Sequence, residues 1–344
     1  MRAELDTESE NPGARERIDS LPILILHAHS SCNCRCVMCD IWKTNEHRAF
    51  SLEALERSMP SIRNLRVRWV VLSGGEPLLN PEWPLICKEL KKEGIRVTLL
   101  STGLLLRKYA AEVRTHCDEV IVSLDGPERV HDEIRRVPRA FSLLAGGVSA
   151  VRELAPRFRI TARTTVQKAN RLHLSATVEA AKSLGLDGIS FLAADLTSHA
   201  FNRPELWSLE RQGEVGLSGR EVEELREEIE SLIRARRAEI ESGFVAESPE
   251  KLRRIVHQFR VHLGLARPES PGCNAPWVSA VVETDGTVRP CFFHRAIGSL
   301  KAGSLEQVLN GREARGFRSS LDVASNPTCN RCVCSLNYRG STML

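Results

Sequence analysis

Short apolar runs alternate with longer amphipathic stretches along residues 21–195 of the sequence. Six apolar runs are rich in Val, Ile, Leu or Thr, which predicts strands at 23–29, 69–73, 96–101, 119–124, 159–166 and 188–192. The stretches between them predict helices at 51–59, 81–93, 105–116, 140–154 and 174–184. This alternation is typical of an α/β fold with a parallel sheet and right-handed crossovers. Periodicity alone leaves open whether the sheet is doubly wound or curved into a barrel.

Polar and conformationally special residues follow the predicted strands. The first strand leads into a Cys-rich segment, the second into Gly-Gly-Glu-Pro, the third into Ser-Thr-Gly and the fourth into Ser-Leu-Asp-Gly. The carboxyl ends of parallel strands are where α/β proteins build their active sites. We therefore expect the functional site at this edge of the sheet.

The second half of the chain has a different pattern. A long charged helix is predicted at 218–241, a second helix at 249–263 and a Pro- and Gly-rich linker at 266–272. Beyond the linker, the runs 278–282 and 287–290 flank an Asp-Gly turn, which predicts a hairpin. The expected division is a flexible arm at 1–20, a core at 21–195, a helical connector at 196–270 and a small α+β module at 271–344.

Composition excludes several classes of protein. The 344 residues carry 48 Lys and Arg against 44 Asp and Glu, and a net charge of +4 is too weak to indicate nucleic acid or membrane binding. No apolar stretch of transmembrane length and no secretory signal is visible, so a cytoplasmic protein is expected. The eleven cysteines gather toward the two ends of the chain, which indicates metal or cluster binding in a reducing compartment.

Three cysteines directly after the first predicted strand, Cys32, Cys36 and Cys39, have the spacing Cys-x3-Cys-x2-Cys. Three thiolates on one loop can hold an iron–sulfur cluster and leave one iron open to a ligand. A structural zinc site normally takes four ligands, whereas this loop offers three. The alternatives to a cluster are a zinc knuckle or incidental buried cysteines. Cys34 lies between the three and is expected to point away from the cluster.

The cysteine loop together with Gly74-Gly75-Glu76-Pro77 after the second strand resembles the radical S-adenosylmethionine (SAM) enzymes. The resemblance implies a partial (β/α)6 TIM-like barrel and a [4Fe–4S] cluster whose open iron is chelated by SAM. Reductive cleavage of SAM would give methionine and a 5′-deoxyadenosyl radical, which abstracts a hydrogen atom from the substrate. It also implies an external electron donor of the flavodoxin or ferredoxin type.

The SAM-contacting residues are expected on the strand ends. The glycines allow a close backbone approach, Glu76 can accept from the SAM ammonium group, and serine or aspartate side chains can bond the ribose. By resemblance, a basic residue in the fifth strand pairs with the SAM carboxylate. Turn chemistry, or an arginine facing solvent, is the alternative for these positions. The expected contacts are Gly74, Gly75, Glu76, Ser101, Ser123, Asp125 and Arg163.

Four C-terminal cysteines, Cys273, Cys291, Cys329 and Cys332, can close a second iron–sulfur cluster or a zinc site. Their order resembles the auxiliary-cluster extension of radical SAM enzymes, called SPASM or, in a shorter form, twitch. Four ligands suit the twitch form, with one auxiliary [4Fe–4S] cluster that has no open iron. Cys334 is then a spare thiol, which is either a catalytic hydrogen-atom donor or a cysteine without a role.

The expected substrate is a small molecule, with a carbinol carbon of a sugar or cyclitol favoured. Loss of hydrogen and an electron would give a ketone, whereas a hydrogen atom from Cys334 would give an epimer. Modification of a ribosomal peptide and a non-enzymatic metal-binding module remain open. The Gly-Gly-Glu-Pro element argues against the module, because a binding module does not need it.

Overall fold

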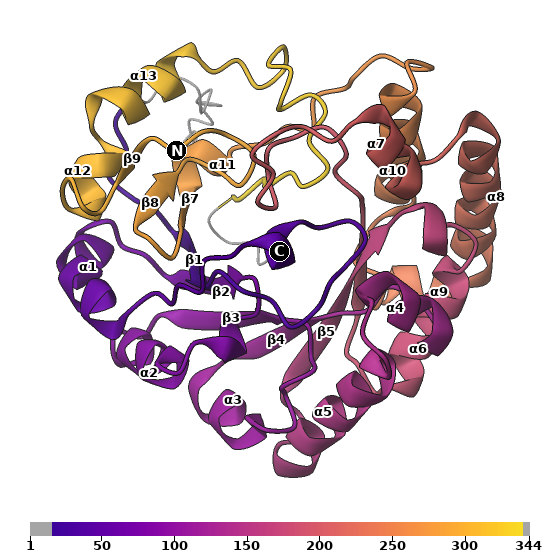
Figure 1. Ribbon diagram of the computed structural model, residues 1–344, viewed down its shortest axis with the longest axis horizontal. Helices are drawn as coiled ribbons and strands as arrows, with labels where there is room; N and C mark the ends of the chain where they lie inside the picture. The colour runs from indigo at the N-terminus through magenta and orange to yellow at the C-terminus, as the bar shows by residue number, and fades with distance from the viewer. Residues whose placement is uncertain (1–15, 340–344) are drawn as a thin grey trace, which may run out of the picture.

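The computed structural model describes residues 16–339, so most of the arm expected at 1–20 lies outside it. Six strands run parallel in sequence order, each beside the next, in one twisted sheet (Figure 1). They are β1 (Ile23–His29), β2 (Trp69–Gly74), β3 (Arg96–Ser101), β4 (Glu119–Ser123), β5 (Arg159–Val166) and β6 (Ile189–Ala193). The α/β prediction with a partial barrel is confirmed, and the sheet ends at β6 instead of closing onto β1.

Helices cover the convex side of the sheet (Figure 1). They include α1 (Leu52–Asn64), α2 (Trp83–Lys92), α3 (Ala110–His116), α5 (Ala140–Leu154) and α6 (Leu174–Ser183). Alternate residues of each strand face them, as in β1, where Leu24 and Leu26 are buried while Ile25 and His27 are partly exposed. Burial of this apolar layer stabilises the fold and leaves the concave side free for polar groups.

Three helical segments differ from the prediction. The first helix continues past Met59 and through Pro60 to Asn64, because Ile62 and Leu65 are buried in the core and their packing outweighs the lost hydrogen bond. A further helix, α4 (Glu128–Arg135), was not predicted, because its eight residues are mostly charged. The predicted helix at 218–241 is interrupted at Arg236, giving α8 (Gly219–Ala235) and α9 (Arg237–Glu241).

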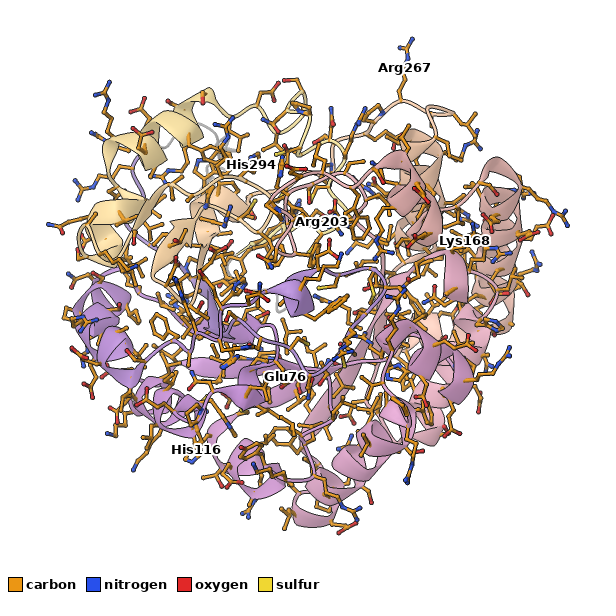
Figure 2. All side chains as sticks on the ribbon, viewed as in Figure 1. Glu76, His116, Lys168, Arg203, Arg267 and His294 are labelled. Carbon is orange, nitrogen blue, oxygen red and sulfur yellow. The ribbon has the colours of Figure 1, made fainter. Side chains whose placement is uncertain are left out.

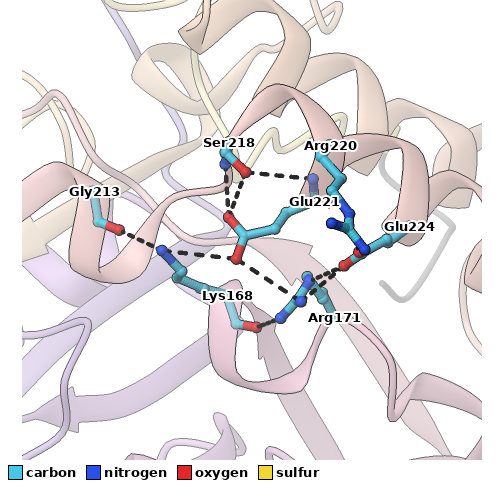
Figure 3. Close-up of polar contacts among 7 residues, drawn as sticks. All are labelled: Lys168, Arg171, Gly213, Ser218, Arg220, Glu221 and Glu224. Carbon is cyan, nitrogen blue, oxygen red and sulfur yellow. Dashed lines mark hydrogen bonds and ion pairs between the residues drawn. The ribbon is translucent and has the colours of Figure 1, made fainter.

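In the connector, α10 (Pro249–His262) contacts β6, α8 packs against α6 and α10, and α7 (Leu209–Val215) contacts the short helix after β5. Figure 3 shows the polar network that joins α8 to the short helix η4 (Lys168–Asn170) after β5. The Glu221 carboxylate accepts from its cap residue Ser218 and lies 3.7 Å from the Lys168 ammonium. Arg171 forms an ion pair of 2.8 Å with Glu224. These contacts fix the start of α8 beside the end of β5.

The C-terminal module extends the same sheet. Strand β7 (Ser279–Val282) lies parallel to β1, and β8 (Thr287–Arg289) and β9 (Gly298–Ser299) follow antiparallel. The predicted hairpin is present, with Gly286 at a φ of 86° in its turn. Up to residue 339, the module also has three helices: α11 (Ala275–Val278), α12 (Leu305–Leu309) and α13 (Arg312–Ser320). The hairpin therefore lies beside the strand that leads into the first cysteine loop.

Two more short helices, η2 (Ile41–Lys43) and η3 (Pro77–Leu79), follow the cysteine loop and the Gly-Gly-Glu segment. Within residues 16–339, no helix has both the length and the apolar character that crossing a bilayer requires.

Candidate active site

The N-terminal cysteine loop is fixed from two sides. The end of α4 accepts hydrogen bonds from the loop, since Arg35 N donates to the carbonyl of Arg135 and Val37 N donates to that of Ile134, both at 3.1 Å. The loop also closes on itself through a bond of 3.3 Å from Cys39 N to the carbonyl of Cys36. The cysteine backbone is therefore held before any ligand binds.

The loop thiols lie close together and are electrostatically distinct. A hydrogen bond from Cys34 and the nearby Arg135 guanidinium lower the pKa of Cys36, against the effect of burial. Hydrogen bonds with Cys32 and Cys36 raise the pKa of Cys34, so this buried thiol lies near those two. That Cys34 points away from a bound cluster stays a prediction. Burial raises the pKa of Cys39 to about 12, while the amide of Ile41, 3.5 Å from its Sγ, opposes this shift.

The two glycines of the Gly-Gly-Glu-Pro element lie against the cysteine loop. Gly74 has a φ of 123°, and a Cβ on Gly75 would lie 2.0 Å from the carbonyl oxygen of Ser31. The amides of Gly75 and Glu76 donate to the carbonyls of His29 and Ser31, at 2.8 and 2.9 Å. Only glycine permits this close approach, which locks the second strand end onto the loop that carries the cysteines.

Glu76 is fully buried between the ends of β2 and β3 (Figure 2). Its oxygens accept from the Leu78 amide, from the Ser101 hydroxyl and from both the amide and the hydroxyl of Thr102, at 2.7–3.1 Å. Burial raises the pKa of this carboxyl, and the bonds from Thr102 oppose that rise. The structure therefore joins two predicted residues, Glu76 and Ser101, to each other.

The other predicted residues form two groups. Ser123 and Arg163 are cross-strand neighbours, partly exposed on the concave side, and Arg163 Nε lies 3.3 Å from the hydroxyl of Ser190. Asp125 is fully buried, with one carboxylate oxygen 2.9 Å from the Thr165 amide and the other 2.5 Å from Nη2 of Arg135. Their roles in SAM binding remain predictions.

The four predicted C-terminal cysteines gather at the other end of the chain. Burial, followed by the nearby Cys291 and Cys273 thiolates, raises the pKa of Cys329 to about 12. His294 Nε2 lies 3.2 Å from the sulfur of Cys329. The exposed Cys334 belongs to the same group, because its amide lies 3.4 Å from the Cys332 sulfur.

Family comparisons agree with both cysteine groups. The description "Radical SAM superfamily" matches residues 29–166, and "Iron-sulfur cluster-binding domain", the SPASM domain, matches residues 273–333. The chain thus carries a radical SAM domain over residues 29–166. It carries a C-terminal SPASM domain, and its cofactors are SAM, a SAM-binding [4Fe–4S] cluster and an auxiliary iron–sulfur cluster.

Curated relatives match only part of this radical SAM chain. An AdoMet-dependent heme synthase of Methanosarcina barkeri is 32% identical over 161 residues, which are 45% of this chain and 46% of that protein. A probable GTP 3′,8-cyclase of Methanococcus maripaludis is 36% identical over 98 residues, which are 27% of this chain and 33% of that protein. The chain therefore spans less than half the length of either relative.

Solved structures resemble the radical SAM chain over most of its length. The structure of anSMEcpe with bound AdoMet has a TM-score of 0.67 at 17% identity and covers 88% of this chain and 84% of its own. Streptococcus suis SuiB bound to precursor peptide SuiA has a TM-score of 0.62 at 14% identity and covers 92% and 71%. At these identities the likeness shows the fold.

The donor sets suit the clusters of a radical SAM protein. Each site offers thiols and backbone amides that donate toward them, as Ala275 N and Leu336 N do to Cys273 at 3.5 and 3.4 Å. The assignment of three thiols to an open cluster and four to a closed one stays a prediction. Among residues 16–339, no three His, Cys, Asp or Glu side chains converge on the position of a single metal ion.

A buried arginine, Arg203, was missed by the sequence reasoning. Figure 2 shows it on the segment that follows β6. Its guanidinium forms an ion pair of 2.6 Å with Asp195, donates to the carbonyl of Met38 at 3.2 Å and stacks on Trp207 at 3.6 Å. Trp207 Nε1 in turn donates to Asp40 at 2.6 Å. No local pattern signals the contacts to the cysteine loop, because Met38 and Asp40 lie more than 150 residues from Arg203 and Trp207 in the sequence.

An aromatic group connects the two halves of the site. Phe201, at a φ of 61°, lies 5.0 Å from Phe292 between ring centroids, and Phe293 packs beside both. The ring of His27 on β1 lies 5.6 Å from that of Phe292. Burial lowers the pKa of His27 to about 4, so its imidazole is neutral at pH 7. The segment after Cys291 therefore reaches the concave side of β1.

Proposed function

We propose that this enzyme removes a hydrogen atom from a small-molecule substrate after reductive cleavage of SAM at the N-terminal cysteine loop. The observation that carries the proposal is the loop itself, whose Cys32, Cys36 and Cys39 offer three ligands and whose backbone is locked by Gly74 and Gly75. When bound, the first cluster supplies the electron that converts SAM into methionine and a 5′-deoxyadenosyl radical, and the second supplies an electron acceptor.

The chain's own residues bind and orient SAM. Arg163 carries the permanent charge suited to the SAM carboxylate, and Ser123 beside it offers a hydroxyl toward the ribose. Gly74 and Gly75 offer backbone groups toward the SAM amino group, with Glu76 and Ser101 holding that strand end in place. Asp125 acts from the buried side of β4, since both of its oxygens bond within the chain.

The favoured substrate is a carbinol, as in a sugar or cyclitol. A carbinol carbon that loses a hydrogen atom and then an electron and a proton becomes a ketone, and the four-cysteine set Cys273, Cys291, Cys329 and Cys332 would hold the acceptor of that electron. A small molecule is also in keeping with the curated relatives, whose names refer to heme and to GTP.

Epimerisation is the second candidate, because Cys334 is an exposed thiol that the four-cysteine set leaves over. Cys334 would donate a hydrogen atom to the substrate radical, on the face opposite to the one from which the first hydrogen atom was removed. A peptide substrate is the third, since SuiB is solved with a precursor peptide, although the shared fold does not transfer that substrate.

A product screen in deuterated solvent separates dehydrogenation from epimerisation. Anaerobic enzyme with about eight irons per chain, as two four-iron clusters require, is incubated with SAM, dithionite and candidate carbinols. A ketone supports dehydrogenation. An epimer that carries deuterium and disappears in Cys334→Ala supports epimerisation. Zinc in place of iron would overturn the proposed function altogether.

A further inference from the structure

Arg135, the last residue of α4, has its guanidinium between a predicted cluster ligand and a buried carboxylate. Nη1 lies 3.5 Å from the sulfur of Cys36, and Nη2 lies 2.5 Å from an oxygen of Asp125. The side chain is 8% exposed, and the carboxylate is 0% exposed. Among the described residues, Nε of Arg135 is buried without a hydrogen-bond partner. The guanidinium therefore directs its two terminal nitrogens to these two groups.

This positive charge is permanent. An arginine does not lose its proton in a protein, and a buried charge is costly unless it is paired. The nearest aromatic base offers no second charge, because burial and Arg135 together lower the pKa of His131 to about 3. His131 instead accepts from the amide of Asp125 at 3.1 Å. One cation and one anion thus stand in sequence behind Cys36, with the cation nearer to the sulfur.

Asp125 is in turn fixed to the sheet. Its second carboxylate oxygen accepts from the Thr165 amide at 2.9 Å, and its carbonyl accepts from Asn170 Nδ2 at 3.0 Å. The carbonyl of Arg135 accepts from the cysteine loop at Arg35. Bonds of the backbone and of the side chain therefore hold the guanidinium at the sulfur. A charge fixed in this way can shift the energy of a group bound at Cys36 without moving itself.

We infer that Arg135 is a positioning residue that donates a charge-assisted hydrogen bond to the Cys36 thiolate and raises the reduction potential of the SAM-binding cluster. Hydrogen bonds to cluster sulfurs and local charge set such potentials, because they stabilise the more negative reduced form. Asp125 offsets part of this charge and so lowers the potential. The inference rests on the proposed function, in that Cys36 must be a cluster ligand.

The test is a potentiometric titration of the full chain with both clusters, followed by electron paramagnetic resonance. The signal of the SAM-binding cluster is identified by its change when SAM is added. Arg135→Gln is expected to lower the midpoint potential of this cluster by about 59 mV, which corresponds to a tenfold change in the redox equilibrium for one electron. Arg135→Lys, which keeps the charge and loses the planar fork, is expected to shift it less in the same direction.

Asp125→Asn is expected to shift the midpoint potential to more positive values, because it leaves the guanidinium charge without its counter-ion. Arg152→Gln is the matched control, since Arg152 on α5 also pairs with an aspartate, Asp187, and bonds to no thiol among residues 16–339. Its midpoint is expected to equal that of the parent. Opposite shifts are the decisive readout, because general damage to the fold would not move the two variants apart.

Unchanged midpoints in Arg135→Gln and Asp125→Asn, or shifts of the same sign, would overturn the inference while leaving the proposed function intact. A parent protein without a SAM-responsive cluster would instead overturn the proposed function. If Arg135→Gln does not retain iron, the other two variants still test the inference. Arg135→Lys is expected to lower the midpoint potential, and Asp125→Asn is expected to raise it.

Discussion

Glu76 shows how a single residue of the site is determined by its surroundings. The groups that reach its carboxylate are all donors: the amides of Leu78 and Thr102 and the hydroxyls of Ser101 and Thr102. A fully buried carboxylate is tolerated here because these bonds replace its hydration. The glutamate of the Gly-Gly-Glu-Pro motif therefore has a structural function, which is to join the ends of β2 and β3.

We expect Glu76→Gln to destabilise the protein by about 1–3 kcal/mol, because the new amide group brings donors toward donors and leaves buried groups unpaired. Chemical denaturation of the anaerobic protein measures this free energy of unfolding. Glu53→Gln, on the exposed side of α1, serves as the control and is expected to stay within about 0.5 kcal/mol of the parent. Equal stability of the two variants would show that the Glu76 bonds are dispensable.

The cysteine assignment gives a second prediction at the scale of one residue. Cys36→Ala is expected to lower the iron content by about four per chain and to abolish formation of 5′-deoxyadenosine from SAM and dithionite. Cys34→Ala removes the neighbouring buried thiol and is expected to retain both properties. The two measurements are iron analysis and product chromatography. A Cys36→Ala protein that still forms 5′-deoxyadenosine at the parent rate would refute the assignment.

At the scale of elements, the segment between β6 and α7 covers the cysteine loop. Arg203 and Trp207 contact Met38 and Asp40, which flank Cys39 on either side, and Arg211 donates to the carbonyl of Val37. A loop that contributes no predicted ligand thus encloses Cys39, the last of the three predicted ligands of the first cluster. Its contacts explain why a non-glycine residue with a φ of 61°, Phe201, is tolerated there.

Arg203→Ala is expected to destabilise the protein by about 3–5 kcal/mol, because it leaves Asp195 buried without its counter-ion. It should also speed the loss of cluster absorbance in air, since the covering segment loses its anchor. Denaturation and visible absorbance measure the two effects. Arg220→Ala, whose side chain is 90% exposed, is the comparison and should match the parent in both. Identical bleaching rates for the two variants would contradict a covering role.

At the scale of the whole molecule, strand β7 makes one sheet of the N-terminal and C-terminal halves. Pairing of β7 with β1 places the C-terminal hairpin next to the strand that leads into the first cysteine loop. The connector adds a second link, because Glu247 accepts from the Phe191 amide of β6 at 2.9 Å. Burial of this carboxyl raises its pKa to about 7, although the bond from Phe191 opposes the rise.

This shift predicts the pH dependence of the fold. Between about pH 4.5, the ordinary pKa of the group, and about pH 7, Glu247 binds more protons in the folded state than in the unfolded state. Its contribution to stability therefore falls as the pH rises through this window. The midpoint of thermal unfolding, compared between the parent and Glu247→Gln, measures the effect. We expect the variant to gain stability relative to the parent as pH increases, and parallel curves would contradict the assigned shift.

The strands could be predicted with accuracy from the sequence because their signal is local. The bounds of β1, β3 and β5 agree with the prediction, since each is an apolar run closed by polar or glycine-containing segments. The short charged helix α4 could not be predicted, because its stability comes from packing and from its bonds to the cysteine loop. The interruption of the connector helix at Arg236 was missed for the same reason.

The sequence by itself determined which domains this protein carries: three cysteines on one loop with a Gly-Gly-Glu-Pro turn indicate the radical SAM domain, and four further cysteines indicate the SPASM domain. Those signals are local, and each lies within a few residues or at a characteristic spacing. Only the tertiary structure decided that Asp125 and Arg135 form a buried pair behind Cys36, and that Arg203 holds the segment over Met38. The physical reason is that burial and charge pairing join residues that are distant in the chain, and no local pattern records such partners.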